Sequence, residues 1–314
     1  MKPLRKHVAI AIDGGGIRGV IVTRALSMLE RHLGQTIHSR CRLTAGTSTG
    51  AIIAAGLGAG LRADRLLDLY VRHGPDIFRP SWRTLVWPLL ARYRYSLEPL
   101  AAALEAELGD LTMGDLWTAD PPTDVVITLF DLVENRSRFV KSWKPEYADW
   151  PVAKAVLASS SVPTYFPVVD GRYVDGGVGS YANPCYLAAY EIQFVLDWHP
   201  AETTLISLGT GRSPHNLAPG AADKYWAWEW LEPILGAFSQ SADDQQVHLV
   251  QTFFEQLDFR RFQVDLREPI AMDDATKMKE LLAYGEELGW KILNDETDPI
   301  QQIKAETVQT RFIH

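Results

Sequence analysis

The sequence contains only two cysteines, Cys41 and Cys185, among 314 residues. So few cysteines exclude a disulfide framework of the kind that small secreted domains use in place of a large core. They also argue against a structural zinc site, because neither cysteine has a second one at ligand spacing. We therefore expect two reduced thiols in an intracellular protein, and no metal ion.

Positive charge is also scarce, since 31 Lys and Arg residues stand against 39 Asp and Glu residues, a net charge of −8. A nucleic-acid-binding surface is normally basic, so we expect no nucleic-acid partner. Long hydrophobic runs are lacking as well. Residues 43–61 carry no charge, but they are rich in Gly, Ala and Thr, which favours a buried strand, turn and helix over a membrane span.

The apolar run at residues 8–12 is too short for the core of a signal peptide and ends at Asp13. We therefore expect a cytoplasmic protein, with peripheral contact to membranes as an option. Secretion as an effector without a cleaved leader is the alternative. The sequence does not indicate an oligomeric state.

Short β-branched runs alternate with amphipathic stretches along the chain, which predicts an α/β fold with a mostly parallel central sheet covered on both faces. The loop 212–220 contains two prolines and is the best candidate boundary. We expect a core domain over residues 1–212 and a mainly helical C-terminal extension, 213–314, packed on it. The expected strands are residues 7–12, 42–45, 124–132, 138–143, 204–208 and 259–265. The expected helices are residues 20–32, 51–56, 66–73, 97–108, 152–159, 186–194, 225–238, 243–257 and 274–293.

Residues 13–19 read Asp-Gly-Gly-Gly-Ile-Arg-Gly and lie between an expected strand and an expected helix. Glycines let the backbone approach a ligand closely, and amide groups at a helix start favour negative charge. One candidate for that charge is the oxyanion of an acyl-transfer reaction. A dinucleotide-binding turn is the alternative, but residues 34–44 lack the acidic residue that would bind the ribose.

Residues 46–50 read Gly-Thr-Ser-Thr-Gly, which fits the nucleophile-elbow pattern G-x-S-x-G. An expected strand precedes Ser48 and an expected helix follows it, as that motif requires. The flanking glycines allow a strained turn, and the amide of Thr49 can join an oxyanion hole. The alternative is a Gly/Ser/Thr turn without function. The context favours Ser48 as a nucleophile.

A serine nucleophile needs a base. Asp175 follows an expected strand and precedes Gly176 and Gly177, where the backbone can turn tightly. Its carboxylate can accept a proton if desolvation raises its pKa toward the working pH. One alternative is a β-turn aspartate without function. The other is a histidine base, for which the chain offers His199, His215 and His248.

The three motifs occur in the order and approximate spacing of patatin-like phospholipases, which the sequence resembles over residues 7–212. Residues 158–167 and 207–211, which read Ala-Ser-Ser-Ser-Val-Pro-Thr-Tyr-Phe-Pro and Ser-Leu-Gly-Thr-Gly, agree with the resemblance. Residues 213–314 carry no family signature. The resemblance implies a three-layer α/β/α sandwich and a Ser–Asp dyad that cleaves acyl esters of lipids such as phospholipids.

The resemblance implies Ser48 as the nucleophile and Asp175 as the general base. It implies an oxyanion hole built from backbone amides, those of Gly14, Gly15, Gly16 and Thr49. Arg18 matches the arginine of the family motif. This arginine either supports the glycine loop, forms a structural salt bridge or attracts a lipid phosphate. The dyad requires no calcium, and we expect no cofactor.

The segment from Phe78 to Tyr95 combines aromatic residues and arginines with two prolines. Trp and Tyr favour the bilayer interface and Arg can meet lipid phosphates, so we expect transient membrane contact there. A packed insertion whose rings belong to the core is the alternative.

The expected function is that of a lipid acyl hydrolase of phospholipase A or lysophospholipase type. A carboxylesterase, thioesterase or acyltransferase on the same dyad is the enzymatic alternative. A lipid-binding or signalling protein on an inactive hydrolase scaffold is the non-enzymatic one, and the intact Ser48 and Asp175 argue against it.

Overall fold

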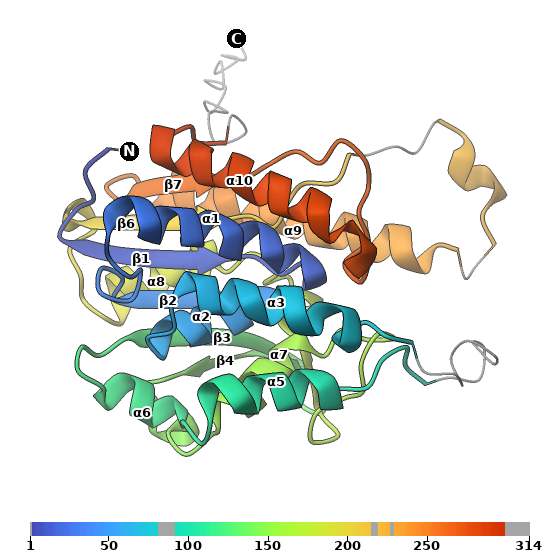
Figure 1. Cartoon of the computed structure of the whole chain (residues 1–314), viewed down its shortest axis with the longest axis horizontal. Coiled ribbons are helices and arrows are strands. Elements are labelled where there is room, and N and C mark those ends of the chain that lie inside the picture. Colours follow the sequence, from blue (N-terminus) through green and yellow to red (C-terminus); the bar gives the residue numbers. More distant parts are fainter. Residues whose placement is uncertain (1, 81–91, 215–218, 227–228, 299–314) are drawn as a thin grey trace, which may run out of the picture.

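The computed structural model describes residues 2–80, 92–214, 219–226 and 229–298. Its strands are β1 (His7–Ile12), β2 (Leu43–Thr47), β3 (Asp124–Asp131), β4 (Arg136–Lys141), β5 (Tyr173–Asp175), β6 (Thr203–Leu208) and β7 (Asp258–Phe262). They form one sheet in the order β4-β3-β2-β1-β6-β7, with β5 paired to β3 beside this path (Figure 1). The neighbouring strands β3, β2, β1, β6 and β7 run parallel to one another, whereas β4 and β5 run antiparallel to β3. The predicted, mostly parallel sheet is confirmed.

Helices cover both faces of the sheet (Figure 1). Val8, Ile10 and Ile12 of β1 belong to a core shared with α1, α2, α3, α5, α7 and α10, while Ala9 and Ala11 face a second core with α8 and α9. This alternation follows from the two-residue period of a strand. The molecule therefore has three α/β/α layers. The helices are α1 (Gly19–Leu33), α2 (Thr49–Gly58), α3 (Ala63–Ile77), α5 (Glu98–Leu108), α6 (Met113–Thr118), α7 (Val152–Ser160), α8 (Cys185–Phe194), α9 (Leu231–Phe253) and α10 (Met278–Asn294).

The sequence motifs meet at one edge of the sheet. Because β1, β2 and β6 are parallel, their carboxyl ends lie together, and this edge is where ligands bind in open α/β sheets. The glycine loop 13–19 follows β1, and Ser48 follows β2. Asp175 ends β5, where its register partner is Leu129 of β3.

The segment after residue 213 contributes to the sheet as well as to the helical layers. β7 pairs in parallel with β6, and α10 packs along α1. Two helices were expected at 225–238 and 243–257, and this is wrong for the described structure, because α9 runs unbroken from Leu231 to Phe253. Its amino-terminal part extends beyond the end of the sheet (Figure 1). The boundary expected at residue 212 stays a prediction.

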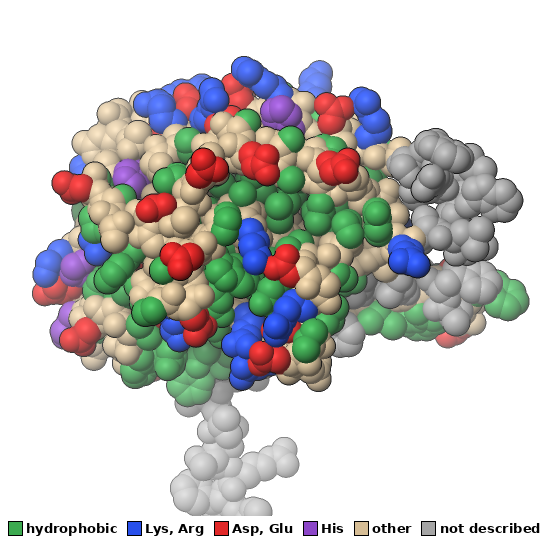
Figure 2. Space-filling view, turned by 90° about the horizontal axis from the view of Figure 1, so that it is seen from below, with side chains coloured by type: hydrophobic (Ala, Val, Ile, Leu, Met, Phe, Trp, Pro, Cys, Tyr) green, Lys and Arg blue, Asp and Glu red, His purple; other side chains and the backbone are tan. Residues whose placement is uncertain are grey.

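The face that carries α5 and α6 shows acidic, basic and hydrophobic side chains interspersed, without a broad area of one charge (Figure 2). Within the described ranges, none of the helices combines the length and apolar character needed to span a membrane.

Candidate active site

Ser48 lies on a strained turn between β2 and α2. Its backbone has φ 55° and ψ −123°, a region that non-glycine residues rarely adopt. The turn is tight because Gly46 and Gly50 approach closely: a Cβ added to Gly46 would lie 2.1 Å from the Gly50 carbonyl oxygen. The Ser48 amide donates to Ser159 Oγ at 2.8 Å. These features give the geometry expected of a nucleophile elbow.

Asp175 is buried at the end of β5, with an exposed fraction of 6%. Its Oδ1 accepts a hydrogen bond from the Gly177 amide at 2.7 Å, whereas Oδ2 has no hydrogen-bond partner in the described structure. Burial raises the pKa of Asp175 to about 6, an effect that the nearby Ser48 side chain and the Gly177 amide oppose. The carboxyl group therefore has a free oxygen and a pKa suited to proton transfer near neutral pH.

The glycine loop lies against the elbow, since a Cβ on Gly14 would be 3.4 Å from Ser48 Cβ. The amide of Gly14, which was expected in the oxyanion hole, donates to the Ala182 carbonyl at 2.8 Å and is not free. The amides of Gly15, Gly16 and Thr49 make no hydrogen bond within the described part of the chain. They are the available donors, and Thr49 also begins α2, where the helix dipole favours negative charge.

Two further long-range contacts help to hold the glycine loop in place. Thr210, after β6, donates to the Gly14 carbonyl at 2.6 Å, and the Ile17 amide donates to the Met272 carbonyl at 2.8 Å. Gly16 has φ 60°, and a Cβ there would lie 2.1 Å from the Met272 oxygen. Only glycine fits this position without displacing the loop.

Replacing Gly16 by alanine is therefore expected to displace the loop and lower kcat by about 100-fold to 1,000-fold, the usual effect of losing one oxyanion donor. Gly171→Ala is the matched control, because Gly171 also has a positive φ of 66° but nothing lies within 4 Å of its added Cβ. Ester hydrolysis by purified variants measures the effect. If Gly16→Ala hydrolysed esters as fast as Gly171→Ala, the position of the glycine loop would not matter for activity.

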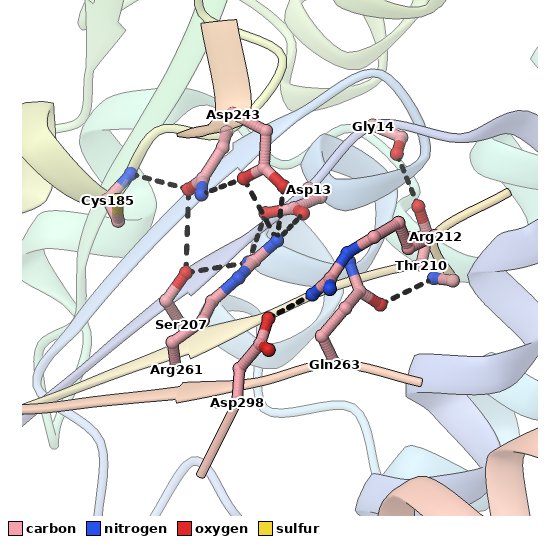
Figure 3. Close-up of polar contacts among 12 residues, drawn as sticks. Asp13, Gly14, Cys185, Ser207, Thr210, Arg212, Asp243, Arg261, Gln263 and Asp298 are labelled. Carbon is pink, nitrogen blue, oxygen red and sulfur yellow. Dashed lines mark hydrogen bonds and ion pairs between the residues drawn. The ribbon is translucent and has the colours of Figure 1, made fainter. Parts of the chain in front are cut away.

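A buried arginine joins the glycine loop to α9. Arg261 of β7 donates to both oxygens of Asp13, at 2.8 and 2.5 Å, and to both oxygens of Asp243 on α9, at 3.0 Å (Figure 3). It also donates to Ser207 Oγ at 2.9 Å. Burial raises the pKa of Asp13, while the Arg261 charge opposes that shift. Asp13, the first residue of the loop, is thus held by an ion pair with Arg261, whose exposed fraction is only 1%.

Arg18 is half-buried and contacts backbone carbonyls and a hydroxyl group rather than a carboxylate. Its guanidinium group lies 3.4 Å from the Gly211 carbonyl oxygen and 3.2 Å from Ser213 Oγ. Its Nε lies 3.4 Å from the Gly15 carbonyl oxygen. These contacts fit support of the loop better than a structural salt bridge.

An apolar pocket opens at Ser48. Its walls come from α2, α3, α5 and the segment 160–166, and its volume is about 40 Å³. Ligand pockets commonly have roughly 300–1,000 Å³, so side chains must move before a long chain can enter. The lining residues include Ile52, Leu69, Ile77, Phe78, Leu100 and Phe166. Ser160 also lines the pocket, and its buried hydroxyl has no hydrogen-bond partner in the described residues.

The ends of the segment expected to touch membranes pack at this pocket. The Phe78 and Tyr95 rings meet edge to face at 5.6 Å, and the Tyr95 hydroxyl donates to Asp273 at 2.7 Å. Tyr93 is exposed. Trp82 and Trp87, on which the membrane prediction chiefly depends, lie outside the described residues.

The histidine alternatives find no support in the described geometry. His199 caps the turn before β6, at the sheet edge opposite Ser48, and His248 is exposed on α9. His215 lies outside the described residues. Within the described ranges, no histidine lines the pocket at Ser48.

Several residues of the site were not recognised as functional from the sequence. Ser159 binds the Ser48 amide, although its serine run was noted only as part of the resemblance. Thr210 belongs to the similarly noted segment 207–211. Arg261 and Asp243 carried no sequence signal, because their role depends on the packing of β7 and α9 beside β1.

Comparisons with known proteins show the family of this chain. A family model described as patatin-like phospholipase matches residues 10–189. Patatin-like protein 2 of Oryza sativa subsp. indica is 28% identical over 89% of this chain and 82% of its own length. A cGAMP-activated phospholipase of Escherichia coli is 27% identical over 68% of this chain and 65% of its own. VipD from Legionella pneumophila aligns at 11% identity with a TM-score of 0.48, over 93% of this chain and 67% of that one. Because the family model matches more than half of the chain, this protein belongs to the patatin-like phospholipase family.

Proposed function

We propose that this protein hydrolyses acyl esters of lipids, as a phospholipase A or lysophospholipase, through Ser48 and Asp175. The observation that carries the proposal is a strained serine that lines an apolar pocket, close enough to the buried carboxyl group of Asp175 to oppose the rise in its pKa. Family membership and relatives named as phospholipases support the same activity.

In the proposed reaction, Ser48 Oγ attacks the ester carbonyl carbon while Asp175 accepts the hydroxyl proton. The negative oxygen of the tetrahedral intermediate binds the amides of Gly15, Gly16 and Thr49. Asp175 returns the proton to the leaving alcohol or lysolipid, and an acyl-serine remains. Water then attacks this ester with Asp175 again as the base, which releases the fatty acid and restores Ser48.

The apolar pocket supports an acyl chain as the group bound beside Ser48. The test is incubation of the purified protein with a panel of phospholipids, lysophospholipids and short soluble esters, with the products identified by mass spectrometry. Release of fatty acid from phospholipids is expected. Cleavage of short esters alone would favour a carboxylesterase, for which the narrow pocket is the supporting observation. Membrane contact through Phe78 to Tyr95 stays a prediction, and so does a location in the cytoplasm or at membranes.

The pH dependence of hydrolysis follows from Asp175. Only its ionised form accepts a proton, so kcat/KM is expected to fall as pH decreases through about 6, well above the ordinary value of 3.8. Initial rates between pH 4 and 9 measure this limb.

Asp175→Asn tests the same assignment and should abolish turnover. A carboxyl group whose pKa is raised by folding destabilises the native state above that pKa, so this variant should gain about 1–3 kcal/mol in unfolding free energy at pH 8. Substantial activity in a folded Asp175→Asn protein would assign the base to another residue, with His215 the first to test.

A further inference from the structure

A second cavity lies along β1 and β6, on the side of the sheet that α1 covers. It has a volume of about 430 Å³ and runs from residues 4–6, before β1, to Leu208 at the end of β6. It shares no lining residue with the pocket at Ser48.

The interior of this cavity is apolar. Two strands, β1 and β6, form its floor, and α1, the loop after it and the end of α10 form its walls. Protein interiors are close-packed, with few voids larger than a water molecule, so an unfilled apolar cavity of this size is unusual. Its volume falls within the range common for ligand pockets. The apolar lining residues are Leu4, Val8, Ile10, Leu26, Leu29, Leu33, Ile37, Cys41, Ile206, Leu208 and Ile292.

The mouth of the cavity is positively charged in a protein of net charge −8. Its charged lining residues are Arg5, Lys6 and Arg40, and no Asp or Glu lines it. Lys6 pairs with Glu202, and the Arg5 guanidinium donates to the carbonyls of Pro200, Thr203 and Gln256, where its charge also acts on Asp258.

Arg40 is the arginine best placed to receive a ligand. It is exposed, and its Nε donates to Gln35 Oε1 at 2.6 Å. Neither Arg5 nor Arg40 forms a salt bridge within the described residues. Arg40 therefore presents a guanidinium group that has no carboxylate partner among the described residues, beside the apolar lining of the cavity. Arginine binds carboxylates and phosphates through paired, charge-assisted hydrogen bonds.

We propose that this cavity binds a single-chain lipid with an anionic head group, whose alkyl chain enters between α1 and the sheet and whose carboxylate or phosphate meets Arg40. A long-chain fatty acid and a lysophosphatidate share this chemistry. The site is separate from the elbow, and its occupancy does not depend on hydrolysis at Ser48.

The first test locates the ligand with palmitate that carries a diazirine on its chain, added to the full-length Ser48→Ala protein. After irradiation, mass spectrometry should find label in the carboxyl-terminal half of α1, in residues 34–41 or at the end of α10. Oleate and lysophosphatidate are separate competitors, and whichever displaces the label more strongly identifies the head group. Label found only at the pocket beside Ser48, or equal competition by uncharged monoolein, would overturn the proposal.

The second test measures oleate affinity by calorimetry below its micelle concentration. Arg40→Gln should weaken binding about tenfold, because a hydrogen bond to a charged group is lost. Leu33→Trp should also weaken it, since Leu33 is 38% exposed and lies at the mouth, where the larger ring would fill the entrance. Arg62→Gln, an exposed arginine outside the cavity, removes the same charge and should leave the affinity unchanged. Wild-type affinity in both Arg40→Gln and Leu33→Trp would overturn the proposal.

Discussion

Ser48→Ala is expected to lower ester hydrolysis by at least about 10⁴-fold and to abolish labelling by a fluorophosphonate probe. Removing the nucleophile of a serine hydrolase costs up to about 10⁶-fold, because the covalent route is lost and only oxyanion stabilisation and binding remain. Ser48 has a positive φ, and alanine at this position would bear the same backbone strain as serine. The variant should therefore fold with little change in stability while it loses activity.

The measurement is probe labelling and hydrolysis by the purified variant, with circular dichroism to verify folding. Ser241→Ala is the matched control, because Ser241 is exposed on α9 and should remain fully active. Continued labelling of a folded Ser48→Ala protein would assign the nucleophile elsewhere, and Ser160 in the same pocket would be the next serine to replace.

Arg261→Met is expected to lower the unfolding free energy by about 3–5 kcal/mol. The loss of one partner from a buried ion pair leaves the other charge uncompensated, and here two carboxylates, Asp13 and Asp243, lose their common cation. The glycine loop begins at Asp13, so hydrolysis should fall as well. Denaturant unfolding and hydrolysis rates on the same preparation measure both effects.

Arg267→Met provides the comparison, because Arg267 is exposed and its removal should change stability by no more than about 0.5 kcal/mol. If Arg261→Met does not fold, Asp243→Asn keeps the pair with Asp13 and should cost less. Unchanged stability and activity in a folded Arg261→Met protein would show that the network does not hold the loop.

The sequence predicted those parts of the site that depend on neighbouring residues. The elbow at Ser48 requires glycines at 46 and 50, and these lie within two positions of it. The strand before Ser48 and the helix after it were predicted for the same reason, since hydrophobic period and turn chemistry are local properties. In the structure, the parallel pairing of β1 and β2 places the glycine loop and Ser48 at the same edge of the sheet.

Contacts between distant parts of the chain could not be predicted in this way. The Gly14 amide is engaged by Ala182, and nothing near Gly14 indicates that partner. The pairing of Arg261 with Asp13 appears only when β7 joins the sheet beside β6. The continuity of α9 was missed because the polar residues 239–241 resemble a connection, although the helix continues through them.

Two contacts of the glycine loop are made with residues that are translated long after the loop itself. Residues 13–19 leave the ribosome more than 200 residues before Arg261 and Met272, which hold them. At roughly 5–20 residues per second, Ser48 is synthesised many seconds before those partners exist. On the proposed function, a nascent chain would carry its nucleophile without a working oxyanion loop until the residues that hold this loop have been translated.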